Sequence, residues 1–76
     1  MSLRPDQLKV LQALSKNPRT LEEIIARTSL TAVQARRILR KLESRKWISK
    51  TTTRRGEVYL ITELGIANVR SVGSYL

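Results

Sequence analysis

The sequence predicts a single α+β domain in which three helices precede a two-stranded β-hairpin and a short C-terminal segment. Up to Arg45, apolar residues recur every three or four positions, which is the spacing that places them on one side of a helix. After Trp47 the recurrence changes to every second position, which is typical of strands. With 76 residues the chain has the size of one small domain, so we expect residues 1–76 to form one folded unit.

The first helix is predicted at about residues 5–16. Pro5 suits its first turn, because proline has a helical φ and lacks an N–H group that the first turn would leave free. Leucines follow at intervals of three: Leu8, Leu11 and Leu14. Pro18 ends the helix, since proline disfavours a helical conformation in the residue before it.

Two further helices are predicted at about residues 21–28 and 31–45, and each begins with a capping box. In a capping box, a threonine side chain and the Glu or Gln three positions later each accept a hydrogen bond from a backbone N–H that the first turn leaves free. The pairs are Thr20 with Glu23 and Thr31 with Gln34. Each cap stabilises its helix by roughly 1 kcal/mol.

The predicted helix at 31–45 has an apolar side and a basic side. Its Arg and Lys residues lie largely outside the expected buried stripe, which consists of Ala35, Ile38, Leu39 and Leu42. Two short helices joined by a tight turn, the second capped and basic, have the organisation of a helix-turn-helix unit. The small residue of the turn is here Thr28 or Ser29.

A β-hairpin is predicted at about residues 47–62, with two strands of β-branched and aromatic residues around the turn Arg54-Arg55-Gly56. The turn contributes two positive charges, so the hairpin has a cationic tip. The alternation leaves open which face of the second strand is buried. We expect Tyr59 and Ile61 to be buried rather than the opposite face, which consists of Val58, Leu60 and Thr62.

The segment after the hairpin has only a weak helical pattern. Gly65 and Gly73 argue against a long helix, because glycine is a poor helix former. Tyr75 and Leu76 at the C-terminus can contribute to a dimer contact. We therefore expect three helices and a short C-terminal segment rather than a fourth helix.

The net charge of +9 is concentrated in one third of the chain. Residues 31–55 contain nine basic residues and one acid, Glu43, which gives a net charge of +8. The other 51 residues have six basic and five acidic side chains, a net charge of +1. Solubility does not require this concentration, so we interpret it as a polyanion-binding surface. Nucleic acid is favoured over an acidic membrane, because the basic stretch covers a helix and a hairpin and not one amphipathic helix.

The composition argues against several classes of protein. The chain has no cysteine and no histidine, so it lacks a thiolate nucleophile, the commonest general base and the commonest metal ligand. Its six scattered acids form no catalytic constellation, and we expect neither an enzyme nor a metal site nor a cofactor. No apolar run reaches the roughly 18 residues of a membrane span, so we expect no membrane partner. A small domain without disulfides suits the cytoplasm, so we expect a cytoplasmic protein.

Two segments carry motifs, one at the end of the basic helix and one at the end of the hairpin. Arg37-Ile-Leu-Arg-Lys-Leu-Glu-Ser-Arg-Lys-Trp-Ile48 resembles the pattern R-x-L-x-x-L-E-x-x-G-hydrophobic-I, and Tyr59-Leu-Ile-Thr-Glu-Leu-Gly65 resembles Y-x-L-T-x-x-G. Both patterns are similar to those of the winged helix-turn-helix family of DNA-binding transcriptional regulators, including small regulators from archaea and from their viruses and plasmids. Lys46 stands where that family usually has glycine.

The resemblance implies sequence-specific binding of double-stranded DNA, with recognition helix 31–45 in the major groove and the basic wing on the backbone or in the minor groove. The groove-facing residues would be Thr31, Ala32, Val33, Gln34, Arg36 and Arg37. Among them, Gln34 can contact adenine, and Arg36 or Arg37 guanine, because each side chain presents a two-pronged match to that base edge. The phosphate contacts would come from Arg40, Lys41, Lys46 and Lys50 and, at the wing tip, from Arg54 and Arg55.

Several alternatives stay open. The Gln34 side chain can be engaged in the capping box, and Arg36 can lie against the protein with its stem over apolar surface. The alternative function is a winged-helix module that binds RNA or another protein. We expect a monomer or a weak homodimer, because no long dimerisation helix is visible in the sequence.

Overall fold

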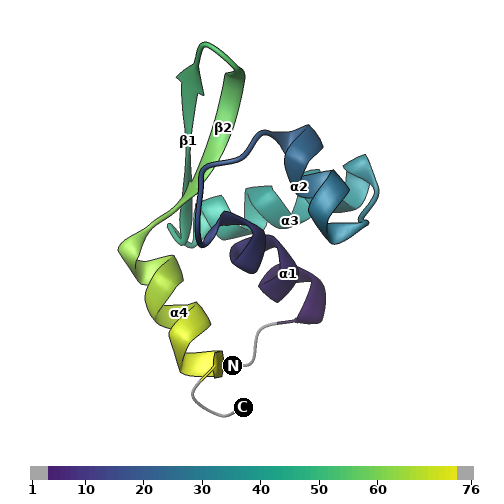
Figure 1. Ribbon diagram of the computed structural model, residues 1–76. Coiled ribbons are helices and arrows are strands. Elements are labelled where there is room, and N and C mark those ends of the chain that lie inside the picture. The colour runs from purple at the N-terminus through teal and green to yellow at the C-terminus, as the bar shows by residue number, and fades with distance from the viewer. Residues whose placement is uncertain (1–3, 74–76) are drawn as a thin grey trace.

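The computed structural model describes residues 4–73, which form four helices and one antiparallel β-hairpin (Figure 1). The predicted dimer contact at Tyr75 and Leu76 lies outside these residues. The elements follow one another as α1 (Pro5–Leu14), α2 (Leu21–Thr28), α3 (Ala32–Ser44), β1 (Ile48–Thr53), β2 (Gly56–Ile61) and α4 (Glu63–Gly73). Expectation and structure therefore agree on α2, α3 and the hairpin, and differ at α1 and α4.

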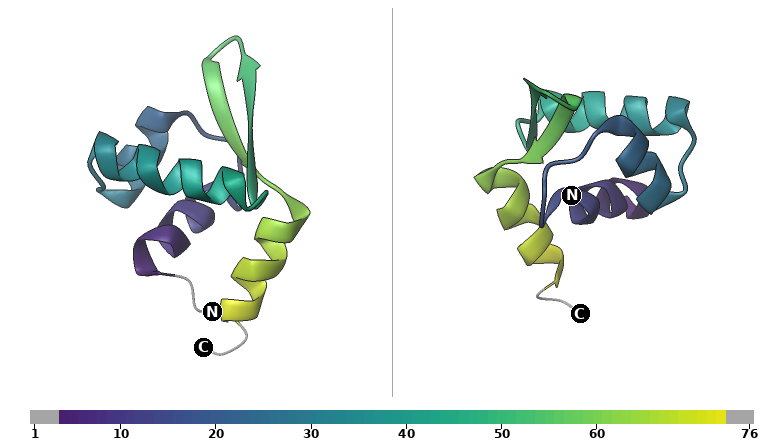
Figure 2. Two further views of the ribbon diagram at one scale, coloured as in Figure 1. Left: turned by 180° about the vertical axis from the view of Figure 1, so that it is seen from behind. Right: turned by 45° about the horizontal axis from the view of Figure 1, so that its top comes forward.

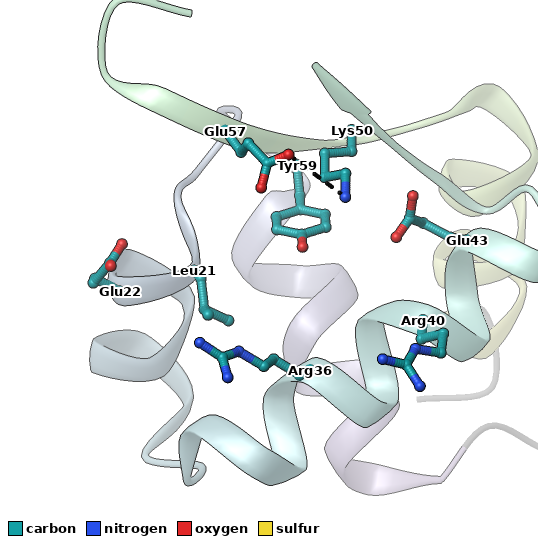
Figure 3. Close-up of a pocket in the computed structure, with 8 residues that line it drawn as sticks. All are labelled: Leu21, Glu22, Arg36, Arg40, Glu43, Lys50, Glu57 and Tyr59. Carbon is teal, nitrogen blue, oxygen red and sulfur yellow. Dashed lines mark ion pairs between the residues drawn. The ribbon is translucent and has the colours of Figure 1, made fainter. Parts of the chain in front are cut away.

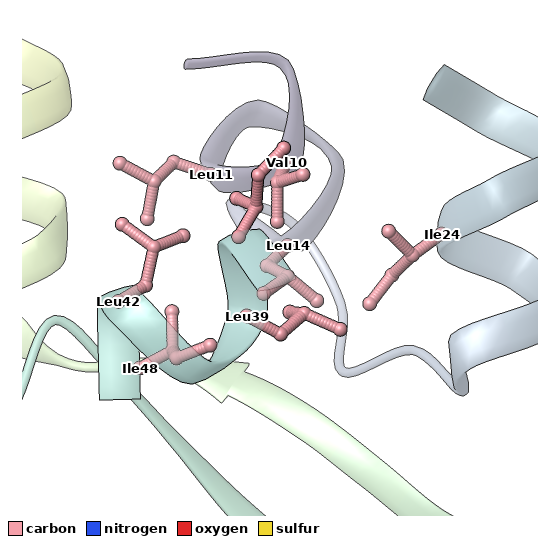
Figure 4. Close-up of a cluster of buried hydrophobic side chains, with 8 residues drawn as sticks. Val10, Leu11, Leu14, Ile24, Leu39, Leu42 and Ile48 are labelled. Atoms are coloured by element: carbon pink, nitrogen blue, oxygen red, sulfur yellow. The ribbon is translucent and has the colours of Figure 1, made fainter. Parts of the chain in front are cut away.

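The hydrophobic core lies where α1, α2 and α3 meet the base of the hairpin (Figure 4). The expected apolar stripe of α3 is buried there: Ala35, Ile38, Leu39 and Leu42. It packs with Val10, Leu11 and Leu14 of α1, Ile24 of α2 and Ile48 of β1. Because this stripe faces inward, the opposite side of α3 faces solvent.

Helix α1 ends at Leu14, two residues before the predicted end. The Ser15 hydroxyl donates a hydrogen bond of 2.7 Å to the Gln12 carbonyl oxygen, and the Ser15 backbone N–H donates to the same oxygen at 3.2 Å. Serine side chains compete in this way with helical hydrogen bonds. The hydrogen bonds of Ser15 thus end the helix, three residues before the proline at position 18 that was expected to end it.

The hairpin pairs β1 with β2 so that Ile48 lies opposite Ile61 and Thr53 opposite Gly56. It rises away from the helices, beside the C-terminal end of α3 (Figures 1 and 2). The outer edge of β2 is paired as well, because the backbones of Arg19 and Tyr59 exchange two hydrogen bonds, of 2.8 and 3.1 Å. This second pairing ties the segment between α1 and α2 to the wing.

The expected burial of Tyr59 and Ile61 alone is wrong. Both side chains are half-buried and pack against the core, but Val58, on the opposite face of β2, is more deeply buried, with 4% of its surface exposed. Val58 lines a hollow together with Pro18 and Arg19. The segment that pairs with the edge of β2 also borders this second face, and the alternation of residues within β2 does not reveal such a neighbour.

A fourth helix, α4, replaces the short C-terminal segment that we expected. Gly65 is buried within it, and a Cβ atom at this position would lie 2.2 Å from the backbone oxygen of Trp47 and 2.7 Å from Ile61 Cγ1. Glycine is therefore required for close packing of α4 on the start of the wing, which outweighs its low helix propensity. Thr62 anchors the same junction, since its hydroxyl donates to the Lys46 carbonyl oxygen at 2.7 Å.

Candidate nucleic-acid interface

The exposed side of α3 forms a stripe directly opposite its buried side. Its members follow at helical spacing: Val33, Arg37, Arg40 and Ser44. In the left view of Figure 2, α3 lies nearest the viewer, and the wing rises beside the C-terminal end of this helix. The stripe and the wing therefore belong to one side of the molecule.

The first turn of α3 is held by the capping box that the sequence predicts. The Thr31 backbone N–H donates to Gln34 Oε1 at 3.0 Å, and the Gln34 N–H donates to Thr31 Oγ1 at 3.1 Å. Of the two alternatives for Gln34, the structure places its side chain in the cap, and only its amide NH₂ group stays available. A two-pronged contact with adenine needs Oε1 as well, so it would require the cap to open.

A hollow of about 360 Å³ separates α3 from the wing (Figure 3). Three predicted DNA-contacting cations line it: Arg36, Arg40 and Lys50. Its wall also contains Tyr59, and the Arg36 side chain extends toward Leu21 of α2 (Figure 3). This direction agrees with the alternative in which Arg36 lies against the protein, but Arg36 remains exposed to solvent.

The charges in this hollow are mixed, because Glu22, Glu43 and Glu57 lie among its walls. Lys50 forms an ion pair with Glu57 across the hairpin, with Nζ 3.6 Å from Oε2. Burial raises the pKa of the Tyr59 hydroxyl, which therefore stays protonated and can donate a hydrogen bond at neutral pH. The hollow thus offers guanidinium and hydroxyl donors, while the charge of Lys50 is already balanced.

Lys41 lies on the other flank of α3 from the first hollow, and Arg37 of the exposed stripe borders that flank. They line a second hollow, of about 170 Å³, together with Arg4 and Asp6 of the α1 region. Two arginines that are adjacent in sequence, Arg36 and Arg37, therefore line two different hollows on α3. Such a pair widens the basic surface of α3 instead of duplicating one contact.

The wing tip presents Arg54 and Arg55 in the turn between the strands. The Arg55 guanidinium forms an ion pair with Glu23, the residue that completes the capping box of α2. The hydrogen bond from the Thr20 N–H and that from Arg55 together lower the pKa of the Glu23 carboxyl to about 2. Arg55 is thereby anchored to α2, whereas Arg54 forms no ion pair within residues 4–73.

Lys46, at the junction of α3 and the wing, has a left-handed backbone conformation with φ of 64°. L-residues adopt this conformation at a cost that glycine does not have. The structure thus gives a physical reason why glycine suits this position in the family that the sequence resembles. The Lys46 side chain itself is exposed and lies at the edge of the basic surface.

The sequence did not reveal three residues that shape this surface: Tyr59, Glu57 and Glu23. The register of the hairpin could have indicated that Tyr59 and Glu57 lie beside Lys50. In this register Lys50 lies opposite Tyr59 and diagonal to Glu57 on one face. No local signal links Glu23 to Arg55, because 32 residues separate them.

Comparison with known proteins places these features in a family. Residues 2–76 match the protein family described as the HVO_A0261 N-terminal domain. No curated protein sequence matches the chain significantly. No helix within residues 4–73 has both the length and the apolar character needed to cross a membrane.

Solved structures confirm the winged helix-turn-helix fold. BpsR of Bordetella bronchiseptica, whose DNA binding is regulated by 6-hydroxynicotinic acid, is 26% identical, with a TM-score of 0.84 over 91% of this chain and 52% of that chain. MepR of S. aureus in complex with DNA is 23% identical, with a TM-score of 0.85 over 95% and 63% of the two chains. The transcriptional regulator Tm0710 of Thermotoga maritima is 20% identical, with a TM-score of 0.84 over 93% and 53%.

The chain spans between about half and two thirds of the length of these neighbours. The similarity therefore covers only part of each neighbour. None of the three is described as an enzyme, in agreement with the expectation for this chain.

Proposed function

Since this chain belongs to the HVO_A0261 N-terminal domain family, we propose that it is a sequence-specific regulator of transcription that binds double-stranded DNA. In this proposal α3 enters the major groove, and the wing contacts the backbone or the minor groove. The resemblance in fold to MepR, whose complex with DNA has been solved, supports the proposal. So does BpsR, a neighbour whose DNA binding is regulated.

The observation that carries the proposal is the state of the cations on α3. None of the four predicted DNA-contacting cations of the helix forms an ion pair within residues 4–73: Arg36, Arg37, Arg40 and Lys41. Positive charge that is neither buried nor paired attracts the phosphates of DNA and releases their counterions. The major groove of B-form DNA admits an α-helix, so the exposed side of α3 can bring these cations to the DNA.

Base and phosphate contacts are assigned to different parts of this surface. Arg36 or Arg37, in the first two turns of α3, is the proposed contact to guanine. The proposed phosphate contacts are Arg40, Lys41, Lys46, Lys50, Arg54 and Arg55. For Lys50 and Arg55, contact with phosphate requires exchange of the partners Glu57 and Glu23.

The salt dependence of binding tests the proposal. If about five to seven phosphates are neutralised, the logarithm of the binding constant falls against the logarithm of salt concentration with a slope of about −4.5 to −6. A duplex selected from a random pool serves as the ligand, and duplex RNA of the same sequence as the competitor. A flat salt dependence, or equal competition by RNA, contradicts the proposal, since the deep and narrow major groove of RNA excludes a helix.

Substitution separates the two kinds of contact. We expect Arg37→Ala to reduce discrimination between the selected duplex and a random duplex by roughly 1–3 kcal/mol, because a base contact is lost. Arg54→Ala is expected to weaken binding to both duplexes alike, because phosphates are the same in every sequence. Equal weakening on both duplexes by Arg37→Ala would refute its assigned base contact.

We propose that the protein acts as a monomer or weak homodimer in the cytoplasm. Two-fold dimers of such regulators bind half-sites about 34 Å apart, so the selected sequences show the assembly directly. A palindromic site would indicate a dimer on DNA, and a single short site a monomer. Sedimentation of the free protein at two concentrations measures the assembly without DNA.

A further inference from the structure

Val33 is a large apolar side chain that lies mostly exposed at the N-terminal end of the basic side of α3. Of its surface 65% is exposed, more than that of the other large exposed apolar residue within residues 4–73, Leu64, at 50%. Exposed apolar surface gains free energy when it is removed from water. The side chain thus provides a contact that the core does not use.

The fold gives no internal reason for valine at this position. Val33 is the second residue of α3, where a β-branched side chain is a poorer helix former than alanine. The capping box is complete without it, since Thr31 and Gln34 make both hydrogen bonds. Nor does Val33 belong to the hydrophobic core or to the residues packed against it.

Its neighbours on the helix surface are cations. Arg36 and Arg37 follow at three and four residues, and Arg40 at seven, so all three lie beside or beyond Val33 on the exposed side. A duplex drawn in by these guanidinium groups would bring its major groove against Val33. The charge around the apolar side chain therefore selects DNA as its occupant rather than an apolar partner.

The major groove presents one apolar group, the C5-methyl group of thymine. Gln34 and the arginines are unsuited to A·T pairs: Gln34 Oε1 is engaged in the cap, and the arginines match the two acceptors of guanine. Thr31 is likewise engaged in the cap, and Ala32 has a smaller side chain than Val33, which is the large exposed apolar residue of this turn. We infer that Val33 recognises a thymine methyl group and is the residue through which α3 selects an A·T pair. This inference rests on the proposed function and adds a specificity-determining residue to it.

Deoxyuridine tests the inference, because it lacks only the C5-methyl group of thymidine. Each thymidine of the selected duplex is replaced in turn, and affinity is measured for the native chain and for Val33→Ala. For the native chain we expect one or two positions at which deoxyuridine weakens binding about threefold to fourfold, the effect of uncovering one methyl-sized group. In Val33→Ala the penalty at those positions disappears, which is the signature of a direct pair in a double-mutant cycle.

Leu64→Ala is the matched control, since it also removes an exposed apolar side chain, but from α4. It is expected to keep the deoxyuridine penalty of the native chain. Thermal unfolding of Val33→Ala confirms that the variant is folded, with a Tm equal to or above that of the native chain because alanine favours helix.

The outcomes separate the inference from the proposed function. Specific duplex binding without a deoxyuridine penalty, or a penalty that persists in Val33→Ala, overturns the role of Val33 and leaves the regulator proposal standing. Absence of binding to any duplex overturns both.

Discussion

The first turns of α2 and α3 share a capping box and differ in charge. In α2, Glu22 and Glu23 follow the capping threonine, whereas the first turn of α3 contains no acid. The hydrogen bonds are otherwise equivalent, with donor–acceptor distances between 2.9 and 3.3 Å in both boxes. The N-terminus of each helix is the positive end of its dipole, so an acid there is stabilising.

The difference shows that one local motif serves two purposes. In α2 the acid of the box also anchors the wing, through the ion pair of Glu23 with Arg55. In α3 the box uses a neutral glutamine, and the turn gives up the stabilising interaction of an acid with the dipole. We interpret this as the condition for phosphate to approach α3, since an acid in its first turn would repel DNA.

Exchange of the box residue is the strongest test of this comparison. We expect Gln34→Glu to weaken DNA binding about tenfold, because one negative charge is placed several ångströms from phosphates. The fold should be as stable as before or slightly more so, because glutamate completes a capping box equally well and favours the helix dipole. Fluorescence anisotropy with a labelled duplex measures the affinity, and thermal unfolding the stability.

Gln12→Glu is the control for net charge. It makes the same change at an exposed position of α1, outside the proposed DNA-contacting residues. We expect it to weaken binding far less than Gln34→Glu. Equal losses in the two variants would mean that total charge, and not the first turn of α3, controls the affinity.

The ends of the two helices allow a second comparison. A left-handed residue follows each helix, Ser29 with φ of 61° after α2 and Lys46 with φ of 64° after α3. Replacement of either by glycine should stabilise the fold by about 0.5–1 kcal/mol, because glycine has no Cβ strain in this conformation. Each variant should then raise Tm by a few degrees.

DNA binding distinguishes these two variants. Ser29→Gly removes no charge and should leave the affinity unchanged. Lys46→Gly removes a proposed phosphate contact, so the slope of the salt dependence should become shallower by roughly one. If the slope is the same for Lys46→Gly as for the native chain, Lys46 makes no phosphate contact.

The acid anchor of α2 predicts a smaller effect that depends on pH. The pKa of Glu23 is lowered from 4.5 to about 2 in the fold, so its contribution to stability is present above pH 4.5 and is lost as the pH falls toward 2. Glu23→Gln keeps the capping box and removes this titration. We expect its urea midpoint to fall less between pH 5 and pH 2.5 than that of the native chain. Parallel curves for the two proteins would show that Glu23 has no such role.

Features that depend on near neighbours were predictable. The capping boxes join residues three positions apart, and the apolar stripe of α3 follows from helical spacing. Both were confirmed, as was the position of the hairpin turn at Arg54 and Arg55, although Gly56 already belongs to β2. For the same reason the candidate surface of α3 could be proposed from the sequence: once one side of a helix is buried, the positions on the other side are determined.

Features that depend on distant segments were not predictable. Gly65 appeared to oppose a fourth helix, and only its approach to the backbone of Trp47 explains why glycine is needed there. Val58 is buried on a face of β2 that borders the chain before α2, and Arg55 is anchored by an acid 32 residues away.

The sequence by itself thus determined the helix starts, the hairpin and the concentration of positive charge, because these arise from backbone geometry and spacing within a few residues. Only the tertiary structure decided which cations are already paired and which glycine supports packing. It also showed that the cap engages Gln34 Oε1, the acceptor that a two-pronged contact with adenine needs. The physical reason is that charge pairing and close packing depend on distances between elements, and these are set when the core is assembled.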